Sequence, residues 1–193
     1  MAAFRCACVV NNDYVWVKTM GLREIVFVPD PVLRRKAHKV TTFDKEFQTL
    51  VDDMVETMRE APGVGLAAPQ VGIPARLIVV EYADEEEEDE EASKEVPKKL
   101  FIVANPEIVK ASEEMEIGPE ACLSVPGLVG DVDRHVKILV KGYNRRGQPV
   151  KIKAEGWLAR IFQHEIDHLE GVLFTDRASR VWKPKEGEPI PAD

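Results

Sequence analysis

Hydrophobic residues in the first third of the chain recur with the period of a helix. Apolar side chains stand at steps of three and four from Phe47 to Met58, with polar residues between them. This pattern gives a helix one hydrophobic face and predicts an amphipathic helix from about 44 to 60. Pro62 and Gly63 then end the helical pattern.

Three further segments have the hydrophobic patterns of strands. Residues 75–82 and 99–106 are short and almost continuously apolar, as is typical of buried strands. Residues 135–156 alternate strictly between apolar and polar, and the turn-forming residues 144–147 interrupt them. The sequence therefore predicts two buried strands and a β-hairpin that exposes one face to solvent.

The last regular segment, 156–171, returns to the helical period. Its apolar side chains gather on one side, and Gly171 is a natural C-terminal stop. We expect a buried helix that packs on the strands. Strands and helices in this order indicate a single α+β domain.

Composition agrees with one soluble globular domain. The 193 residues are 45% hydrophobic and 31% charged, and no apolar run approaches the ~20 residues of a membrane span. The formal net charge is −8, but residues 84–95 alone contain nine acidic residues and one lysine. We expect this stretch to be a flexible, solvated loop insert. Nothing in the rest of the sequence indicates a basic face for nucleic acid.

The two ends of the chain and its cysteines bear on where the protein works. Residues 1–20 lack the basic start and long apolar core of a signal peptide, and we expect a loosely ordered extension. Residues 178–193 are polar and Pro-rich, as in a tail. Three cysteines are too few for a disulfide framework and suit a reducing compartment. We therefore expect a cytoplasmic protein without membrane contact.

The expected last helix contains the stretch QHEIDHLEG (163–171), which matches the H-E-x-x-H pattern of metal hydrolases. The four-residue step from His164 to His168 puts both imidazoles on one face of a helix. Glu165 can then reach a metal-bound water from the same helix. Histidines that serve only the core or the surface remain the alternative.

A hydrolytic metal site normally has three protein ligands and one open position. The downstream candidates for a third ligand fail. Phe174 stands where a metalloprotease of this type would need another histidine, and Glu186 and Glu188 lie in the Pro-rich tail. His38 and His135 are more consistent with structural or surface roles.

Cys122 is the remaining candidate for the third ligand. It lies in GPEACLSVPG (118–127), an irregular segment that is suited to presenting one side chain. A single cysteine is more often a small buried residue. Beside an incomplete two-histidine site, the ligand interpretation is the better one, and a Cys–His–His set suits Zn²⁺ or Fe²⁺.

A third segment, PGVGLAAPQVG (62–72), carries two closely spaced glycines and Gln70. No strand precedes it, so it is not a phosphate-binding loop. It is either a tight loop that leads into a strand or a wall along which a substrate backbone lies. In the second case, Gln70 would be a neutral hydrogen-bond donor.

Together, GVGLAAPQ, EACLS and QHEIDHLEG resemble the motifs of the peptide deformylase family in order and spacing, over about residues 24–177. The resemblance implies a hydrolase that removes the N-formyl group from N-formylmethionine of newly synthesised polypeptides and releases formate. It also implies antiparallel β-sheets around a central HExxH helix, with a catalytic domain over 21–177. Ala121 departs from the pattern, because the family usually has glycine before its cysteine.

Carried over residue by residue, the resemblance also implies roles in the site. One divalent ion, Fe²⁺ by expectation with Zn²⁺, Ni²⁺ or Co²⁺ as substitutes, would be bound by Cys122, His164 and His168. Glu165 would be the general base and later the proton donor. The developing oxyanion would be held by Gln70 and by the backbone N–H of Leu123.

The substrate side of the site is the remaining expectation. Gly65 and its neighbour Gly63 would line the path of the substrate backbone. A methionine side chain requires an apolar slot, for which Val64, Trp157 and Ile161 are the candidates. We expect a monomer that acts on formylmethionyl peptides and nascent chains. The resemblance also allows transient ribosome contact, although the segment after Asp176 is too short and broken to indicate the basic C-terminal helix through which some family members dock.

Two other classes of protein are alternatives to a hydrolase of formyl peptides. A zincin-type metalloprotease would need a downstream ligand that the sequence does not provide. A non-enzymatic structural metal site would leave Glu165 unexplained and would need a fourth protein ligand.

Overall fold

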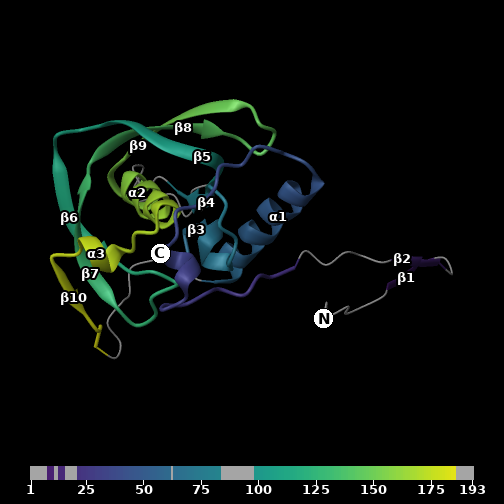
Figure 1. Ribbon diagram of the computed structural model, residues 1–193, viewed down its shortest axis with the longest axis horizontal. Helices are drawn as coiled ribbons and strands as arrows, with labels where there is room; N and C mark the ends of the chain where they lie inside the picture. The colour runs from purple at the N-terminus through teal and green to yellow at the C-terminus, as the bar shows by residue number, and fades with distance from the viewer. Residues whose placement is uncertain (1–7, 11–12, 16–20, 62, 84–97, 186–193) are drawn as a thin grey trace, which may run out of the picture.

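The computed structural model describes residues 8–10, 13–15, 21–61, 63–83 and 98–185. Two sheets with antiparallel pairing account for most of its strands, and this confirms the mixed architecture that the sequence predicts (Figure 1). The acidic stretch 84–95 lies outside the described residues. Among the described residues, no helix combines the length and the apolar character that crossing a membrane requires.

The larger sheet has five strands in the order β3-β4-β5-β8-β9, each antiparallel to its neighbours. Strands β4 and β5 pair from Leu77 with Ala104 to Tyr82 with Lys99. Strands β8 and β9 are the expected hairpin. The bounds are β3 (Gly65–Ala67), β4 (Leu77–Tyr82), β5 (Lys99–Ala111), β8 (Lys137–Tyr143) and β9 (Pro149–Glu155).

The smaller sheet has the order β10-β7-β6, and the hydrophobic pattern did not predict its individual strands. The pattern in β6 (Met115–Glu120) is interrupted by glycine and proline, and β7 (Val129–His135) buries an arginine where an apolar residue is typical. Strand β10 (Arg180–Trp182) pairs with β7. It lies within residues 178–193, the segment expected to be a tail. Within the expected N-terminal extension, β1 (Cys8–Val10) pairs antiparallel with β2 (Asp13–Val15).

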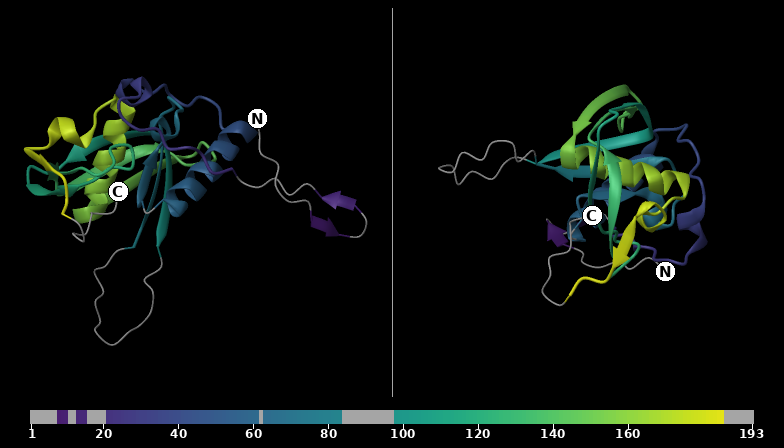
Figure 2. Two further views of the ribbon diagram at one scale, coloured as in Figure 1. Left: turned by 90° about the horizontal axis from the view of Figure 1, so that it is seen from below. Right: turned by 90° about the vertical axis from the view of Figure 1, so that its left-hand side faces the viewer.

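Helix α1 (Lys45–Glu60) covers one face of the larger sheet. The side chain of Asp44 caps its start by accepting a hydrogen bond from the Phe47 backbone N–H at 3.0 Å. Val79 of β4 belongs to the same hydrophobic core as α1, whereas Val80 belongs to the core of α2. Successive residues of a strand point to opposite faces, so the two helices lie on opposite sides of β4, as the left view of Figure 2 shows.

Helix α2 (Gly156–Glu170) is buried all around. Every residue from Leu158 to Leu169 is buried, because strands of both sheets pack against the helix. Phe162 and Leu169 are fully buried, and each such side chain contributes about 2 kcal/mol of hydrophobic stabilisation. Gly171 ends the helix in the left-handed conformation, with φ of 75°.

Three short helices complete the described fold. They are the 3₁₀ helices η1 (Pro31–Arg34) and η2 (Ala68–Val71) and the helix α3 (Phe174–Arg177). Helix η2 directly follows β3, so it continues the glycine-rich segment that begins at Gly63. Helix η2, which includes Gln70, contacts α2.

Candidate metal centre

The structure brings Cys122, His164 and His168 together. Their ligand atoms all lie within 4.8 Å of one another, and all three residues are buried. Cys122 lies two residues beyond the end of β6 at Glu120, and its Sγ lies 3.3 Å from Nε2 of His168. This separation is short enough for one ion, at ~2.0–2.3 Å from each donor, to contact both atoms. A thiolate with two imidazoles is a donor set that Zn²⁺ and Fe²⁺ accept, so the residues fit the expected ion.

A buried carboxylate orients one of the histidines. Nδ1 of His164 lies 3.0 Å from Glu120 Oε2, which leaves Nε2 on the other side of the ring for a ligand bond. Arg134 donates two hydrogen bonds to the Glu120 carboxylate at 2.8 and 2.9 Å, and Arg160 donates a third at 3.0 Å. Sequence reasoning missed Glu120. A metal-binding histidine usually pairs with a carboxylate. Glu120 stands only two residues before the candidate ligand Cys122, and this proximity was the signal for it.

Burial and these neighbours set the charges around the site. Burial raises the pKa of Glu120, but hydrogen bonds from Arg134 and His164 outweigh that effect and lower it well below its usual range. Burial, together with repulsion by His164 and Arg134, lowers the pKa of His168 well below its ordinary value. Glu120 is therefore a carboxylate and His168 a neutral imidazole, the form that binds metals.

Glu165 is fully buried and lies on α2 between the two histidines. Its carboxylate rests against Gly65, the first residue of β3, where there is no side chain to displace it. Gly65 was expected to line the path of the substrate. In the structure, its immediate neighbour is the side chain of Glu165.

Gln70 presents its amide N–H₂ to the site. The residue is fully buried, and its Oε1 accepts a hydrogen bond from the Ala67 backbone N–H at 2.7 Å. This contact fixes the orientation of the amide, so Nε2 faces Cys122 Sγ at 3.6 Å.

Leu123 follows Cys122 and is half-buried. A Cβ atom on Gly63 would lie 3.1 Å from Leu123 Cδ1, so these two residues pack closely.

Comparison with known proteins agrees with this geometry. Residues 22–183 match the model of the family described as Polypeptide deformylase. The chain belongs to the polypeptide deformylase family.

Relatives in the deformylase family cover most of the chain. A peptide deformylase of Symbiobacterium thermophilum is 51% identical over 162 residues, which are 84% of this chain and 69% of the relative. The crystal structure of peptide deformylase from Ehrlichia chaffeensis has a TM-score of 0.75 at 41% identity and covers 83% of this chain and 89% of its own. A peptide deformylase of Acinetobacter baumannii, solved bound to Met-Ala-Ser, has a TM-score of 0.73 at 35% identity, with 82% and 99% of the chains covered.

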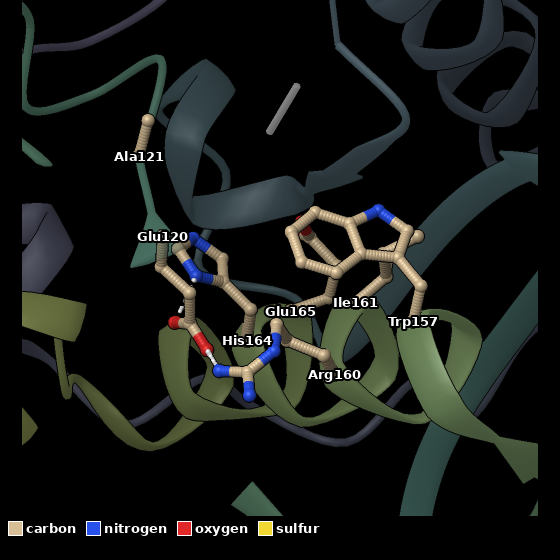
Figure 3. A pocket seen from close by; sticks show the side chains of 7 residues that line it. All are labelled: Glu120, Ala121, Trp157, Arg160, Ile161, His164 and Glu165. Atoms are coloured by element: carbon tan, nitrogen blue, oxygen red, sulfur yellow. Dashed lines mark hydrogen bonds and ion pairs between the residues drawn. The ribbon is translucent and has the colours of Figure 1, made fainter. Parts of the chain in front are cut away.

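A small cavity in this deformylase-family chain opens beside His164 and Glu165. Its wall includes Trp157 and Ile161, each one helical turn from the next on α2, and Figure 3 shows both side chains next to Glu165. Arg160 also lines this cavity, although the sequence did not indicate it. Of the other expected pocket residues, Val64 packs against the hydrophobic core around α2.

Proposed function

We propose that this chain is a metal-dependent peptide deformylase, which removes the N-formyl group from N-formylmethionine at the start of newly synthesised polypeptides. The observation that carries the proposal is the buried cluster of Cys122, His164 and His168 with Glu165 on the same helix. Membership of the polypeptide deformylase family supports the reaction class. In this arrangement, α2 is the central helix around which the sheets hold the site.

Cys122, His164 and His168 would hold one divalent ion. We infer Fe²⁺ as the working ion, with Zn²⁺, Ni²⁺ or Co²⁺ able to replace it, because a thiolate and two imidazoles suit these metals. When bound, the ion supplies Lewis acidity and lowers the pKa of a water molecule. Glu120 keeps His164 in the orientation and tautomer that this role needs.

Glu165 is the general base and then the general acid in the proposed reaction. It takes the proton of the water that attacks the formyl carbon. It then delivers this proton to the departing amine nitrogen as the C–N bond breaks, so the products are formate and a free N-terminal amine. Its buried position beside both histidines supports this role.

Gln70 and the backbone N–H of Leu123 would stabilise the negative charge that develops on the formyl oxygen. The Ala67 contact aims Nε2 of Gln70 at the site before substrate arrives, so the amide needs no reorientation. One such preorganised donor lowers a barrier by about 3 kcal/mol.

The substrate would lie between the glycine-rich segment and α2. Gly63, Val64 and Gly65 would follow the peptide backbone, and Trp157 and Ile161 would contact the methionine side chain. The cavity beside Glu165 supports this placement. The Acinetobacter baumannii relative was solved with a bound peptide that begins with methionine, which is consistent with the same substrate class.

The wider setting of the activity is also a proposal. Residues 21–177 would form the catalytic domain, flanked by an extension over 1–20 and a tail over 178–193. The protein would act as a monomer in the cytoplasm, where formylated chains are made, and would meet its substrate as nascent chains leave the ribosome.

The decisive experiment is formate release from formyl-Met-Ala-Ser by protein prepared with iron under anaerobic conditions. We expect formate in equal amount to new N-terminal amine. Acetyl-Met-Ala-Ser is the matched control and should release no acetate at a comparable rate. Absence of formate release by the metal-loaded protein would contradict the proposed function.

A further inference from the structure

Arg160 is a buried cation that the catalytic scheme above does not use. Its side chain is 7% exposed and extends from α2 to the smaller sheet. One terminal nitrogen donates to Glu120 Oε1 at 3.0 Å and to the Val132 carbonyl at 2.8 Å. The other donates to the Glu116 carbonyl at 2.6 Å. These contacts fix the guanidinium against both β6 and β7.

Gly118 of β6 makes this arrangement possible. A Cβ atom on Gly118 would lie 2.8 Å from one terminal nitrogen of Arg160 and 2.9 Å from its Cζ. Gly118 does not have the left-handed backbone conformation, so its backbone does not require glycine. The missing side chain therefore provides the space that the guanidinium occupies.

The Glu120 carboxylate links Arg160 to the metal ligands. Arg160 and Arg134 both donate to Glu120 Oε1, while Oε2 contacts His164 at 3.0 Å. Displacement of Arg160 would leave this carboxylate with Arg134 as its arginine partner among the described residues. The carboxylate would then have fewer contacts that hold it in the position from which it orients His164.

The same side chain lines the proposed substrate pocket. Arg160 shares the cavity wall with Trp157 and Ile161, and its Cζ lies 5.9 Å from the centre of the Trp157 ring. Figure 3 shows the side chain reaching from α2 to Glu120 beside Trp157. Arg160 therefore borders the pocket and also contacts the carboxylate that orients His164.

We propose that Arg160 is a positioning residue that connects the substrate pocket to the metal ligand His164 through Glu120. Its aliphatic stem forms a wall for the first side chain of the peptide, and its guanidinium fixes the carboxylate that orients the histidine. The role of Arg160 as a wall of the substrate pocket rests on the proposed function, whereas its role in fixing the carboxylate that orients His164 does not.

The test compares Zn²⁺ affinity with the kinetics of formyl-Met-Ala-Ser hydrolysis in the full chain. Arg160→Met keeps a stem but removes the charge, so we expect the dissociation constant of Zn²⁺ to rise about tenfold with little change in KM. Arg160→Ala should weaken Zn²⁺ binding similarly and should also raise KM, because the wall is lost. Zn²⁺ affinity is measured by competition with a chelator, which needs no activity.

Two further variants serve as an independent probe and a control. Gly118→Ala keeps Arg160 but displaces its guanidinium, so Zn²⁺ affinity should fall as it does in Arg160→Met. This variant decides the test if the Arg160 variants do not fold. Arg145→Met removes an arginine that pairs with Asp52 on α1, away from the site, and should leave Zn²⁺ affinity and KM unchanged.

The outcomes separate the two halves of the proposal. Wild-type Zn²⁺ affinity in folded Gly118→Ala and Arg160→Met would overturn the positioning role. Equal KM values for Arg160→Met and Arg160→Ala would overturn the pocket role. If the variants lose Zn²⁺ affinity but even the wild-type protein hydrolyses no formyl peptide, the positioning role stands and the proposed function fails.

Discussion

A Cβ atom on Gly65 would lie 2.4 Å from Oε1 of Glu165 and 2.8 Å from its Cδ. Real side chains do not approach this closely, so any residue with a Cβ at position 65 must displace the carboxylate. Gly65 does not have the left-handed conformation, and its backbone would accept another residue. The absence of a side chain at this position therefore serves the placement of Glu165.

The first prediction follows from this contact. Gly65→Ala should lower kcat about a hundredfold, because a displaced general base no longer reaches the attacking water. Metal content should stay at the wild-type level, because no ligand moves. Gly21→Ala is the control, since nothing lies within 4 Å of a Cβ atom there. Steady-state kinetics that show wild-type kcat for Gly65→Ala would contradict the role of Glu165.

The second prediction concerns Glu165 itself. Glu165→Gln keeps the shape of the side chain but removes its ability to accept a proton. We expect kcat to fall between about 10² and 10⁴-fold while metal content is retained. Elemental analysis and formate release measure the two quantities on the same sample. Loss of the metal would instead identify Glu165 as a ligand.

The third prediction concerns the thiolate. Cys122→Ala should lose most of its bound metal, because two histidines alone form an incomplete site. Ser124→Ala, in the same loop, is a matched control. Its buried hydroxyl has no hydrogen-bond partner among the described residues, so its removal should leave metal content unchanged. Unchanged metal content in Cys122→Ala would remove the cysteine from the site.

The fourth prediction separates the two ends of the Gln70 amide. Gln70→Glu keeps an oxygen for the Ala67 backbone N–H but replaces the donor that faces Cys122. We expect kcat to fall at least about a hundredfold, which corresponds to the loss of one oxyanion donor, with a smaller effect on KM. A variant with wild-type kcat would show that another group holds the oxyanion.

The fifth prediction concerns the acidic stretch. Deletion of residues 84–95 removes the entire formal net charge of −8. We expect the rate on short formyl peptides to stay nearly unchanged, because the stretch contributes none of the proposed site residues. Formate release from formyl-Met-Ala-Ser by the shortened chain tests this. A large loss of activity would assign the stretch a role in catalysis or folding.

The sequence predicts those parts of the site that local spacing determines. His164 and His168 are one helical turn apart, so the position of one ring fixes that of the other once the segment is helical. Cys122 was predicted as the third ligand because few other residues in the chain could complete a metal site. The structure brings the three together, while their roles as ligands remain predictions.

The charged surroundings of the site could not be predicted in the same way. Glu120, Arg134 and Arg160 meet across 14 to 40 positions of sequence, from β6, β7 and α2. Hydrophobic periodicity reports which face of an element is buried, but not which buried charges become partners. Strand prediction from periodicity also requires apolar residues at buried positions. Glu120 and Arg134 are charged, so the pattern did not identify β6 and β7 as strands.

The burial of α2 on all sides determines how its sequence can change. A helix at the surface accepts substitutions on its exposed face, so its tolerance to mutation rises and falls with each turn. From Leu158 to Leu169, α2 has no such face. A saturation-mutagenesis profile should therefore show a continuous block of intolerant positions there, without a helical period. The proposed catalytic constraints and the packing constraints thus coincide along one uninterrupted stretch of the chain.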